Sequence, residues 1–202
     1  RRFVLGTNDY TERVVLVPLS GRVAASAPGV DLLSRHAGDA QLGLRAGTVD
    51  LVVGASRSWP GDIEHEDLYE ERHVCLLRRG HPAARGLLTA ERYAGLSHVL
   101  VAPGGSPTSH IDRRLAALGL SRRVARTVGT FSVAPHLLID SDLVLMLAER
   151  LALPAARELG LVVVEAPFAV RFPISMAWHR RTSGDPAQAW LRAEVRAAVA
   201  GT

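Results

Sequence analysis

The sequence predicts an α/β fold made of two lobes that are joined by a two-stranded hinge. Strand-like apolar segments alternate with helix-like segments, an order typical of doubly wound sheets. This order occurs twice, first up to residue 54 and again between residues 89 and 164. Two long strand-like segments, "ERHVCLLRR" at 71–79 and "FPISMAWH" at 172–179, can carry the chain to the second lobe and back. We therefore expect two subdomains: residues 1–75 with 171–202, and residues 76–170.

The first repeat contains five segments. In order they are a strand at 3–6, a helix from 9 to about 25, a strand at 30–36, a helix at 39–46 and a strand at 50–54. Asp9 is expected to cap the first helix, with Glu12 completing a capping box. Pro18 and Gly21 predict a kink or a loosening inside this helix. The strand "DLVVG" at 50–54 is a continuous apolar run, as in strands buried on both faces of a parallel sheet.

The second repeat follows the same order. It contains a helix at 89–95, a strand at 98–102, a helix from Ser109 to Gly119 opened by Ser109 and Asp112, a strand at 124–128, a helix capped by Ser132 and interrupted near Pro135, a strand at 143–147, a helix near 154–159 ended by Gly160, and a strand at 162–164. A last helix follows the second hinge strand. Asp185 should cap it, Pro186 should take its first position and Gln188 should complete the capping box.

Composition places the chain among soluble globular proteins. It has 202 residues, of which 48% are hydrophobic. No run of about 18 apolar residues could span a bilayer, and the start lacks the apolar core of a secretory signal. The single cysteine, Cys75, excludes an internal disulfide and suits a reducing compartment. We expect a cytoplasmic protein without membrane contact.

The positive charge does not indicate a nucleic-acid surface. The formal net charge is +4, and all 24 basic residues are arginines, because the sequence has no lysine. These arginines are scattered, with only short doublets, and aromatic residues do not interleave them as in a single-strand platform. We expect them on solvated faces and in salt bridges.

Candidate binding residues follow the predicted strands, because ligands of open α/β sheets collect beyond the carboxyl ends of the strands. Helix N-termini there offer unpaired N–H groups. Small and hydroxyl-bearing residues dominate these ends, although each also has an ordinary role as a helix cap or loop residue. The candidates are Thr7, Asn8, Asp9, Ala55, Ser56, Gly105, Ser106, Thr108, His110, Thr130, Phe131 and Ser132. A carboxylate at Asp9 would repel an anion, so an anionic group is better expected at 106–109 or 130–132.

Catalysis has no positive signal in the sequence. The phosphate-binding loop, the dinucleotide-binding glycine motif and the nucleophile elbow are all missing. The eight histidines do not form a metal-binding pattern, and Ser109 beside His110 does not by itself align a nucleophile with a base. We expect no enzymatic activity, no metal and no cofactor.

Ordered motifs along nearly the whole chain resemble the effector-binding domain of LysR-type transcriptional regulators. They are "LGTNDY", "VPL", "APGV", "LRAGTVDLVVGA", "EERHVCLLRRGHP", "SHVLVAPGG", "TFSVAPHLL", "DSDLVLMLAERLA" and "MAWHRR" with "DPAQAWLR". The "RRGHP" and "MAWH" pieces look like the branch with aromatic-acid and flavonoid-type inducers. The resemblance implies a type 2 periplasmic-binding-protein fold of two Rossmann-like subdomains joined by two crossover strands.

The resemblance also implies a function in transcription control. A small aromatic or carboxylated effector would bind in the interlobe cleft, with 7–9 on the first-lobe side and 106–110 and Thr130-Phe131 on the second. Such regulators form dimers and tetramers, and they bind DNA through an N-terminal winged helix-turn-helix that this sequence does not contain. A periplasmic solute-binding protein of an ABC transporter has the same fold and is the alternative. An α/β enzyme is a third and less supported hypothesis.

Overall fold

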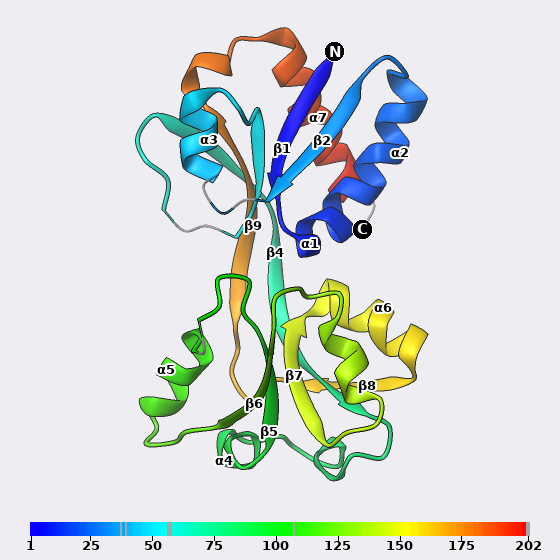
Figure 1. Cartoon of the computed structure of the whole chain (residues 1–202), viewed down its shortest axis with the longest axis vertical. Coiled ribbons are helices and arrows are strands. Elements are labelled where there is room, and N and C mark those ends of the chain that lie inside the picture. Colours follow the sequence, from blue (N-terminus) through cyan, green and yellow to red (C-terminus); the bar gives the residue numbers. More distant parts are fainter. Residues whose placement is uncertain (37, 39, 56–57, 107, 201–202) are drawn as a thin grey trace. The chain divides into compact units, whose positions relative to one another are not determined.

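The chain folds into two compact units, which are connected twice by strands. The computed structural model describes residues 1–36, 38, 40–55, 58–106 and 108–200. One unit comprises Arg1–Glu71 and the residues from Phe172 onward, and the other comprises Arg72–Arg171. Strands β4 (Ile63–Arg78) and β9 (Arg171–His179) each contain one of the two crossing points (Figure 1). The division expected from the sequence, after residues 75 and 170, falls in the same two connections and stays a prediction.

The first unit has a mixed five-stranded sheet in the order β2-β1-β3-β9-β4. Strand β1 runs parallel to β2 and β3, whereas β9 runs antiparallel to β3. This is the alternation of strands and helices that the sequence predicts. Besides β4 and β9, the elements are β1 (Arg2–Thr7), α1 (Asp9–Thr11), η1 (Glu12–Leu16), α2 (Val17–Ser26), β2 (Asp31–His36), α3 (Ala40–Ala46), β3 (Leu51–Gly54), η5 (Arg180–Thr182) and α7 (Pro186–Val199).

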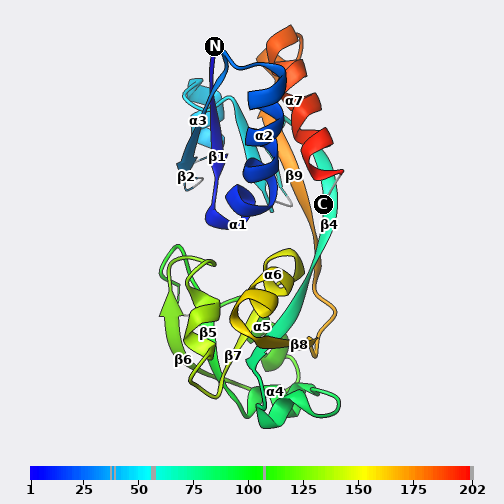
Figure 2. The same cartoon turned by 90° about the vertical axis from the view of Figure 1, so that its right-hand side faces the viewer.

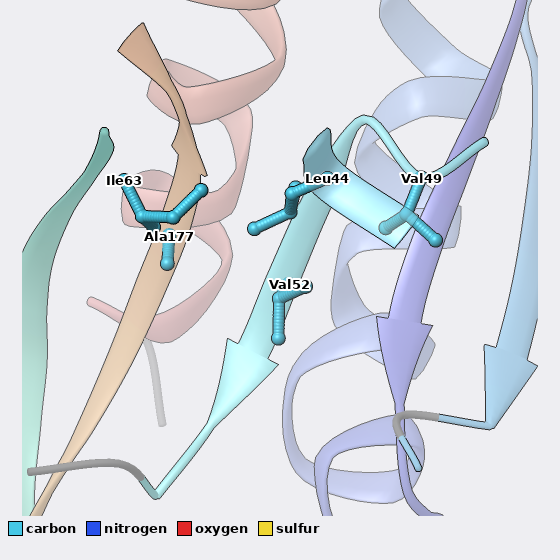
Figure 3. Close-up of a cluster of buried hydrophobic side chains, with 5 residues drawn as sticks. All are labelled: Leu44, Val49, Val52, Ile63 and Ala177. Atoms are coloured by element: carbon cyan, nitrogen blue, oxygen red, sulfur yellow. The ribbon is translucent and has the colours of Figure 1, made fainter. Parts of the chain in front are cut away.

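Helices cover both faces of this sheet. Figures 1 and 2 show α2 and α7 together on one face and α3 on the other. On the α3 face, Val52 of β3 lies opposite Ala177 of β9 in the ladder. These two residues form a buried cluster with Leu44, Val49 and Ile63 (Figure 3). Burial of such aliphatic side chains stabilises the unit by about 1.5–3 kcal/mol for each large side chain.

The second unit repeats the design around strand β5. Its sheet has the order β4-β7-β5-β6, and β8 pairs with β4. Strand β5 is parallel to β6 and β7, while β4 is antiparallel to β7 and β8. Because β4 has a partner on each side here, its residues Val74 to Leu77 are fully buried. The other elements are η3 (Pro82–Ala84), α4 (Ala90–Ala94), β5 (Ser97–Val101), α5 (His110–Ala116), β6 (Arg123–Val128), η4 (Ala134–Leu138), β7 (Leu143–Ala148), α6 (Glu149–Leu159) and β8 (Leu161–Glu165).

The first helix is capped one residue earlier than the sequence analysis expects. Asn8 has extended backbone angles and its side chain accepts the N–H of Thr11, so Asn8 is the N-cap and Asp9 is the first helical residue. The prediction that Asp9 caps with Glu12 is therefore wrong. Asn8 and not Asp9 is the cap, because Asn8 still has the extended backbone that a capping residue requires.

The predicted irregularity inside this helix is confirmed. Residues Glu12–Leu16 form a π-helical turn, in which the N–H of Val17 reaches the carbonyl of Glu12 five residues back. Pro18 follows at the start of α2 and has no N–H to donate to the preceding turn. The wider turn accommodates this missing hydrogen bond, and such turns are frequent at functional sites.

Of two other expected helix caps, the one at Ser132 is wrong and the one at Asp185 is confirmed except for its capping box. Ser132 is not the cap of the next helical turn: the cap position is Val133, which makes no side-chain capping bond, and a 3-10 helix follows. Asp185 does cap α7, accepting from the N–H groups of Ala187 and Gln188. However, the Gln188 side chain does not complete a capping box; its Nε2 donates to Asp50 Oδ1 at 2.7 Å. The Gln188 side chain therefore bonds Asp50, which is distant in the sequence, instead of the backbone at Asp185.

Candidate functional site

The parallel strands of the first unit end together. Thr7 lies opposite His36 in the β1–β2 ladder, and Gly6 lies opposite Val52, so β1, β2 and β3 finish at one edge of the sheet. Thr7 is buried, and its hydroxyl donates to Glu12 Oε1 at 3.1 Å. Residue 55 follows β3 at the same edge and is exposed. Ser56, also a candidate, lies outside the described residues.

A capping box fixes the helix that begins at this edge. The N–H of Thr11 donates to Asn8 Oδ1 at 3.0 Å, and the N–H of Asn8 donates to Thr11 Oγ1 at 3.0 Å. Asp9 stands half-buried in the first turn. The structure thus brings Thr7, Asn8, Asp9 and Ala55 to the same edge, as the sequence predicts for residues that follow parallel strands.

Helix α1 and strand β4 form a polar cluster that was not predicted from the sequence. Tyr10 donates its hydroxyl to Glu71 Oε2 at 2.6 Å and shares a hydrogen bond with the Tyr69 hydroxyl at 3.0 Å. Burial, and next the neighbouring Tyr69, raise the pKa of Tyr10 well above its usual value. Tyr69 and Glu71 are two residues apart on β4, so they share one face of the strand. That spacing was visible in the sequence, but their partner on α1 was not.

A second polar pair lies beside the end of β3. Ser175 of β9 is buried opposite Gly54, and its hydroxyl donates to Asp67 Oδ1 at 2.6 Å. Asp67 precedes Tyr69 and Glu71 by the same two-residue step along β4. Strand β4 therefore presents alternate polar side chains near this edge, in a segment before residue 71 where no strand is expected from the sequence.

The second unit has a corresponding edge. Val101 at the end of β5 lies opposite Val128 at the end of β6, and the N–H of Ala102 donates to the Val128 carbonyl at 2.8 Å. The loops that follow carry the predicted candidates. Gly105 has a positive φ of 72°, which a residue with a Cβ would adopt only with strain. The candidates exposed at this edge are Gly105, Ser106, Thr108, His110, Thr130 and Ser132, while Phe131 is half-buried.

The start of α5 is held by a network around Arg122. Ser109 and Asp112 form the predicted capping box, with Ser109 N–H donating to Asp112 Oδ2 at 2.6 Å. Arg122 donates to both Asp112 oxygens, at 2.8 and 3.1 Å, and to Ser109 Oγ at 3.1 Å. It also donates to the Tyr93 hydroxyl at 2.7 Å. The arginines were expected on solvated faces and in salt bridges; Arg122 does form a salt bridge, with Asp112, but its side chain is only 2% exposed and so does not lie on a solvated face.

This network changes how Asp112 titrates. Burial acts to raise the pKa of Asp112, but the hydrogen bonds from Arg122 and from the Ser109 backbone outweigh it and hold the pKa at about 2. The carboxylate is therefore charged at neutral pH and the pair with Arg122 is fully formed. The same bonds engage the Ser109 hydroxyl, which donates to Asp112 Oδ2 at 3.1 Å rather than to the adjacent His110.

Two histidines stack at this edge. The rings of His73 on β4 and His110 on α5 are 5.5 Å apart and inclined by only 22°. Burial, and then the charge of His110, lower the pKa of His73 to about 4, so His73 is neutral at physiological pH. A shallow hollow opens beside His110. It is lined by Thr108, Ser109, His110, Asp112, Arg113 and Ala116.

The two edges carry hydroxyls, backbone N–H groups and aromatic rings. Groups of these kinds can hydrogen-bond to a ligand or stack on it. Within the part of the chain that the structure describes, no three histidine, cysteine or acidic side chains gather as a metal site. Among the same residues, no helix is both long and apolar enough to cross a bilayer.

Two α/β units linked by β4 and β9, each with polar loops at the carboxyl ends of parallel strands, define a domain with the type 2 periplasmic-binding-protein fold. The solved structures agree with this class. The regulatory domain of MexT, a transcriptional activator in Pseudomonas aeruginosa, is 28% identical with a TM-score of 0.86, covering 98% of this chain and 97% of that one. The probable transcriptional regulator PA0477 from the same species is 31% identical with a TM-score of 0.87, covering 98% of this chain and 66% of that one.

The chain belongs to the LysR substrate binding domain family, whose model matches residues 1–200. It is 34% identical over 194 residues to the HTH-type transcriptional regulator SyrM of Rhizobium meliloti (strain 1021), covering 95% of this chain and 60% of that protein. It is 30% identical over 195 residues to the HTH-type transcriptional activator NahR of Pseudomonas putida, covering 95% of this chain and 65% of that protein. The chain thus spans about 60–65% of the length of these curated relatives.

The comparisons bear on the alternatives raised by the sequence. The resemblance to LysR-type regulators and the fold that it implies are confirmed. The matched proteins are regulators of transcription, which does not favour a solute-binding protein of a transporter.

Proposed function

We propose that this chain is the ligand-sensing domain of a LysR-type transcriptional regulator. A small aromatic or carboxylated effector would bind in a cleft between the two units, against the edges that carry Thr7 to Asp9 and Ser106 to His110. The bound state would then alter DNA binding by a segment outside this chain. The full regulator would act in the cytoplasm as a dimer or tetramer, without enzymatic activity of its own.

One observation carries this proposal. In each unit a capping box fixes a helix start at the carboxyl end of the parallel strands, through Asn8 and Thr11 in the first and Ser109 and Asp112 in the second. A capping box holds each helix start in one conformation, so the loop groups beside it can meet a ligand in a fixed geometry.

The chemistry of the second edge supports the ligand class. Exposed hydroxyls at Thr108 and Thr130 can hydrogen-bond a carboxylate or a phenol, while the Ser106 hydroxyl donates to the Thr108 carbonyl at 3.1 Å. Half-buried Phe131 offers an apolar contact to a ring. The neutral His73 ring supports the exposed His110 ring that is stacked on it. This edge therefore suits a planar ligand with one polar group.

Binding must favour one arrangement of the protein over another to carry a signal. A ligand with equal affinity for two conformations shifts nothing, however tightly it binds. The effector is therefore proposed to contact both units, so that its contacts are complete in only one arrangement of the domain.

A thermal-shift screen with benzoate, 4-hydroxybenzoate and cinnamate tests the proposal. A ligand that binds only the folded state adds about 2.7 kcal/mol at one hundred times its Kd, which raises the melting temperature by several degrees. Thr130→Ala should weaken the affinity of a positive probe in calorimetry. Thr127→Ala is the matched control, because Thr127 is an exposed threonine of β6, before the loop. Equal affinities of the two variants would contradict the site, and no shift with any probe would contradict the ligand class.

A further inference from the structure

Two adjacent residues of β4 form hydrogen bonds to different helices. Glu71 is the last residue of the first unit and Arg72 is the first residue of the second. In a strand, neighbouring side chains point to opposite faces. Glu71 has a hydrogen bond to α1 and Arg72 has one to α6. Each of these helices begins at the carboxyl-end edge of its own unit.

In the first unit the partner is α1. Glu71 is only 2% exposed and accepts the hydroxyl of Tyr10 at 2.6 Å. Tyr10 follows Asn8 and Asp9 directly and is itself buried. A buried hydrogen bond of this length holds the two backbones close together, since breaking it would remove one of the bonds of a carboxyl group in the interior.

In the second unit the partner is α6. Arg72 donates through Nε to Glu149 Oε2 at 2.8 Å and makes a second bond from Nη2 to Glu149 Oε1. Glu149 is the first residue of α6, directly after the end of β7. Arg72 also donates to Glu165 at the end of β8, at 2.8 and 3.1 Å. From His73 onward, β4 is joined to β7 by the sheet ladder.

We propose that Glu71 and Arg72 are positioning residues that couple the candidate-site helix α1 to helix α6 through the strand backbone that joins them. Movement of α1 on ligand binding pulls Tyr10 and Glu71, and the strand passes that displacement to Arg72 and Glu149. The biological meaning of this coupling rests on the proposed function. The coupling itself is a property of the ligand-free chain.

Hydrogen–deuterium exchange of the ligand-free chain tests the coupling. Tyr10→Phe keeps the buried ring and removes only the hydroxyl that Glu71 accepts. Exchange should accelerate about tenfold or more in peptides covering 9–16 and 69–74, because a hydrogen bond to a carboxylate corresponds to a factor of about ten to one hundred. If the coupling exists, exchange should also rise, about threefold, in peptides covering 149–153.

Matched variants separate coupling from loss of stability. Tyr69→Phe removes a hydroxyl of the same cluster but leaves the Tyr10–Glu71 bond, so residues 149–153 should be unaffected. Val23 is a buried residue of α2, so Val23→Ala should destabilise the first unit while leaving the Tyr10–Glu71 bond in place, and it should leave 149–153 unchanged. If Val23→Ala accelerates exchange at 149–153 as much as Tyr10→Phe does, or if Tyr10→Phe leaves it unchanged, the proposal is overturned.

The reverse experiment starts from the second unit. Glu149→Gln removes the charge that anchors Arg72 to α6, and it should accelerate exchange at 69–72 and at 9–12. Glu165→Gln is its control, because the side chain of Glu165 is 70% exposed and its pair with Arg72 contributes little. Indistinguishable exchange in the two variants would overturn the proposal. A ligand screen without hits would contradict the proposed function but would leave these exchange rates as expected.

Discussion

Replacing Arg122 by methionine should destabilise the second unit far more than removing any surface arginine. Arg122 is enclosed by Asp112, Ser109 and Tyr93, to which it makes four hydrogen bonds. Methionine fills a similar volume but leaves the Asp112 charge without its cation. The Ser109–Asp112 capping box of α5 then has to hold that carboxylate alone.

The magnitude follows from burial. Removing one partner of a buried ion pair costs about 3–5 kcal/mol, because the remaining charge stays desolvated. Asp112 is about one-quarter exposed, so the lower end of that range, about 3 kcal/mol, is the better expectation. This is a large part of the 5–15 kcal/mol by which a domain is typically stable.

Urea unfolding of the wild type and two variants provides the assay. Arg196→Met is the matched control: Arg196 also forms a two-pronged pair, with Glu66, but its side chain is 46% exposed. Its loss should cost no more than about 1 kcal/mol. Arg122→Lys keeps the positive charge but loses the planar guanidinium group, which bonds both Asp112 oxygens. Its free energy of unfolding should therefore lie between those of the wild type and Arg122→Met. Equal losses for Arg122→Met and Arg196→Met would refute the reasoning.

Three further predictions concern titration, backbone conformation and capping. Burial is the main cause that lowers the pKa values of His73 and His98 to about 4. The contribution of the two neutral rings to stability is therefore complete above pH 6.5 and is lost as the pH falls toward 4. NMR titration should show both rings neutral at pH 5.5, and normal pKa values would disprove this. Gly160→Ala should lower the free energy of unfolding by about 1–2 kcal/mol, because the φ of Gly160 is +67°. Gly21→Ala should raise it by about 0.5–1 kcal/mol, because Gly21 lies inside α2 with open space around it. Thermal unfolding measures both, and effects of the same sign would contradict these backbone conformations. Asn8→Ala should cost about 1 kcal/mol and Asn8→Ser much less, measured by urea unfolding, since serine also caps; a full loss with serine would mean that the Asn8 side chain acts in another way.

Much of the fold is encoded in local pattern. The apolar strands after Asp50 and Asp142, the capping box at Ser109 and the glycine end at Gly160 all appear in the structure as expected, because each depends on neighbouring residues alone. The cap at Asn8 was displaced by one residue because Asn8 and Asp9 are both good caps, and only the end of β1 decides between them.

Elements that depend on distant partners were harder to predict. Strand β4 begins at Ile63, eight residues before the expected start at 71, in the polar segment "IEHEDLYE". Its extended form is explained by its pairing with β9, more than 100 residues later in the chain, as in the bond between Asp67 and Ser175. Helix α6 begins at Glu149, before the helix expected near 154–159, and Pro154 lies inside it.

In the candidate site, too, positions set by the local sequence could be predicted, whereas contacts between distant residues could not. The positions of Thr7 at the end of β1, and of Gly105 and Thr130 in the loops after β5 and β6, could be predicted from the pattern of strands. The Tyr10–Glu71 bond joins residues 61 positions apart, and Arg122 reaches back to Asp112 around the end of α5. No local pattern reports contacts of this kind, since they depend on how helices are placed against the sheet.

Hydrogen exchange with and without a bound aromatic carboxylate tests the central claim most directly. If the effector is held by both units, amides at 7–9 and 54–55 in the first unit and at 105–110 and 130–132 in the second should all be protected by the same ligand. Protection should saturate at one ligand concentration in both units. Protection confined to one unit, or found away from the ends of the parallel strands, would contradict the account.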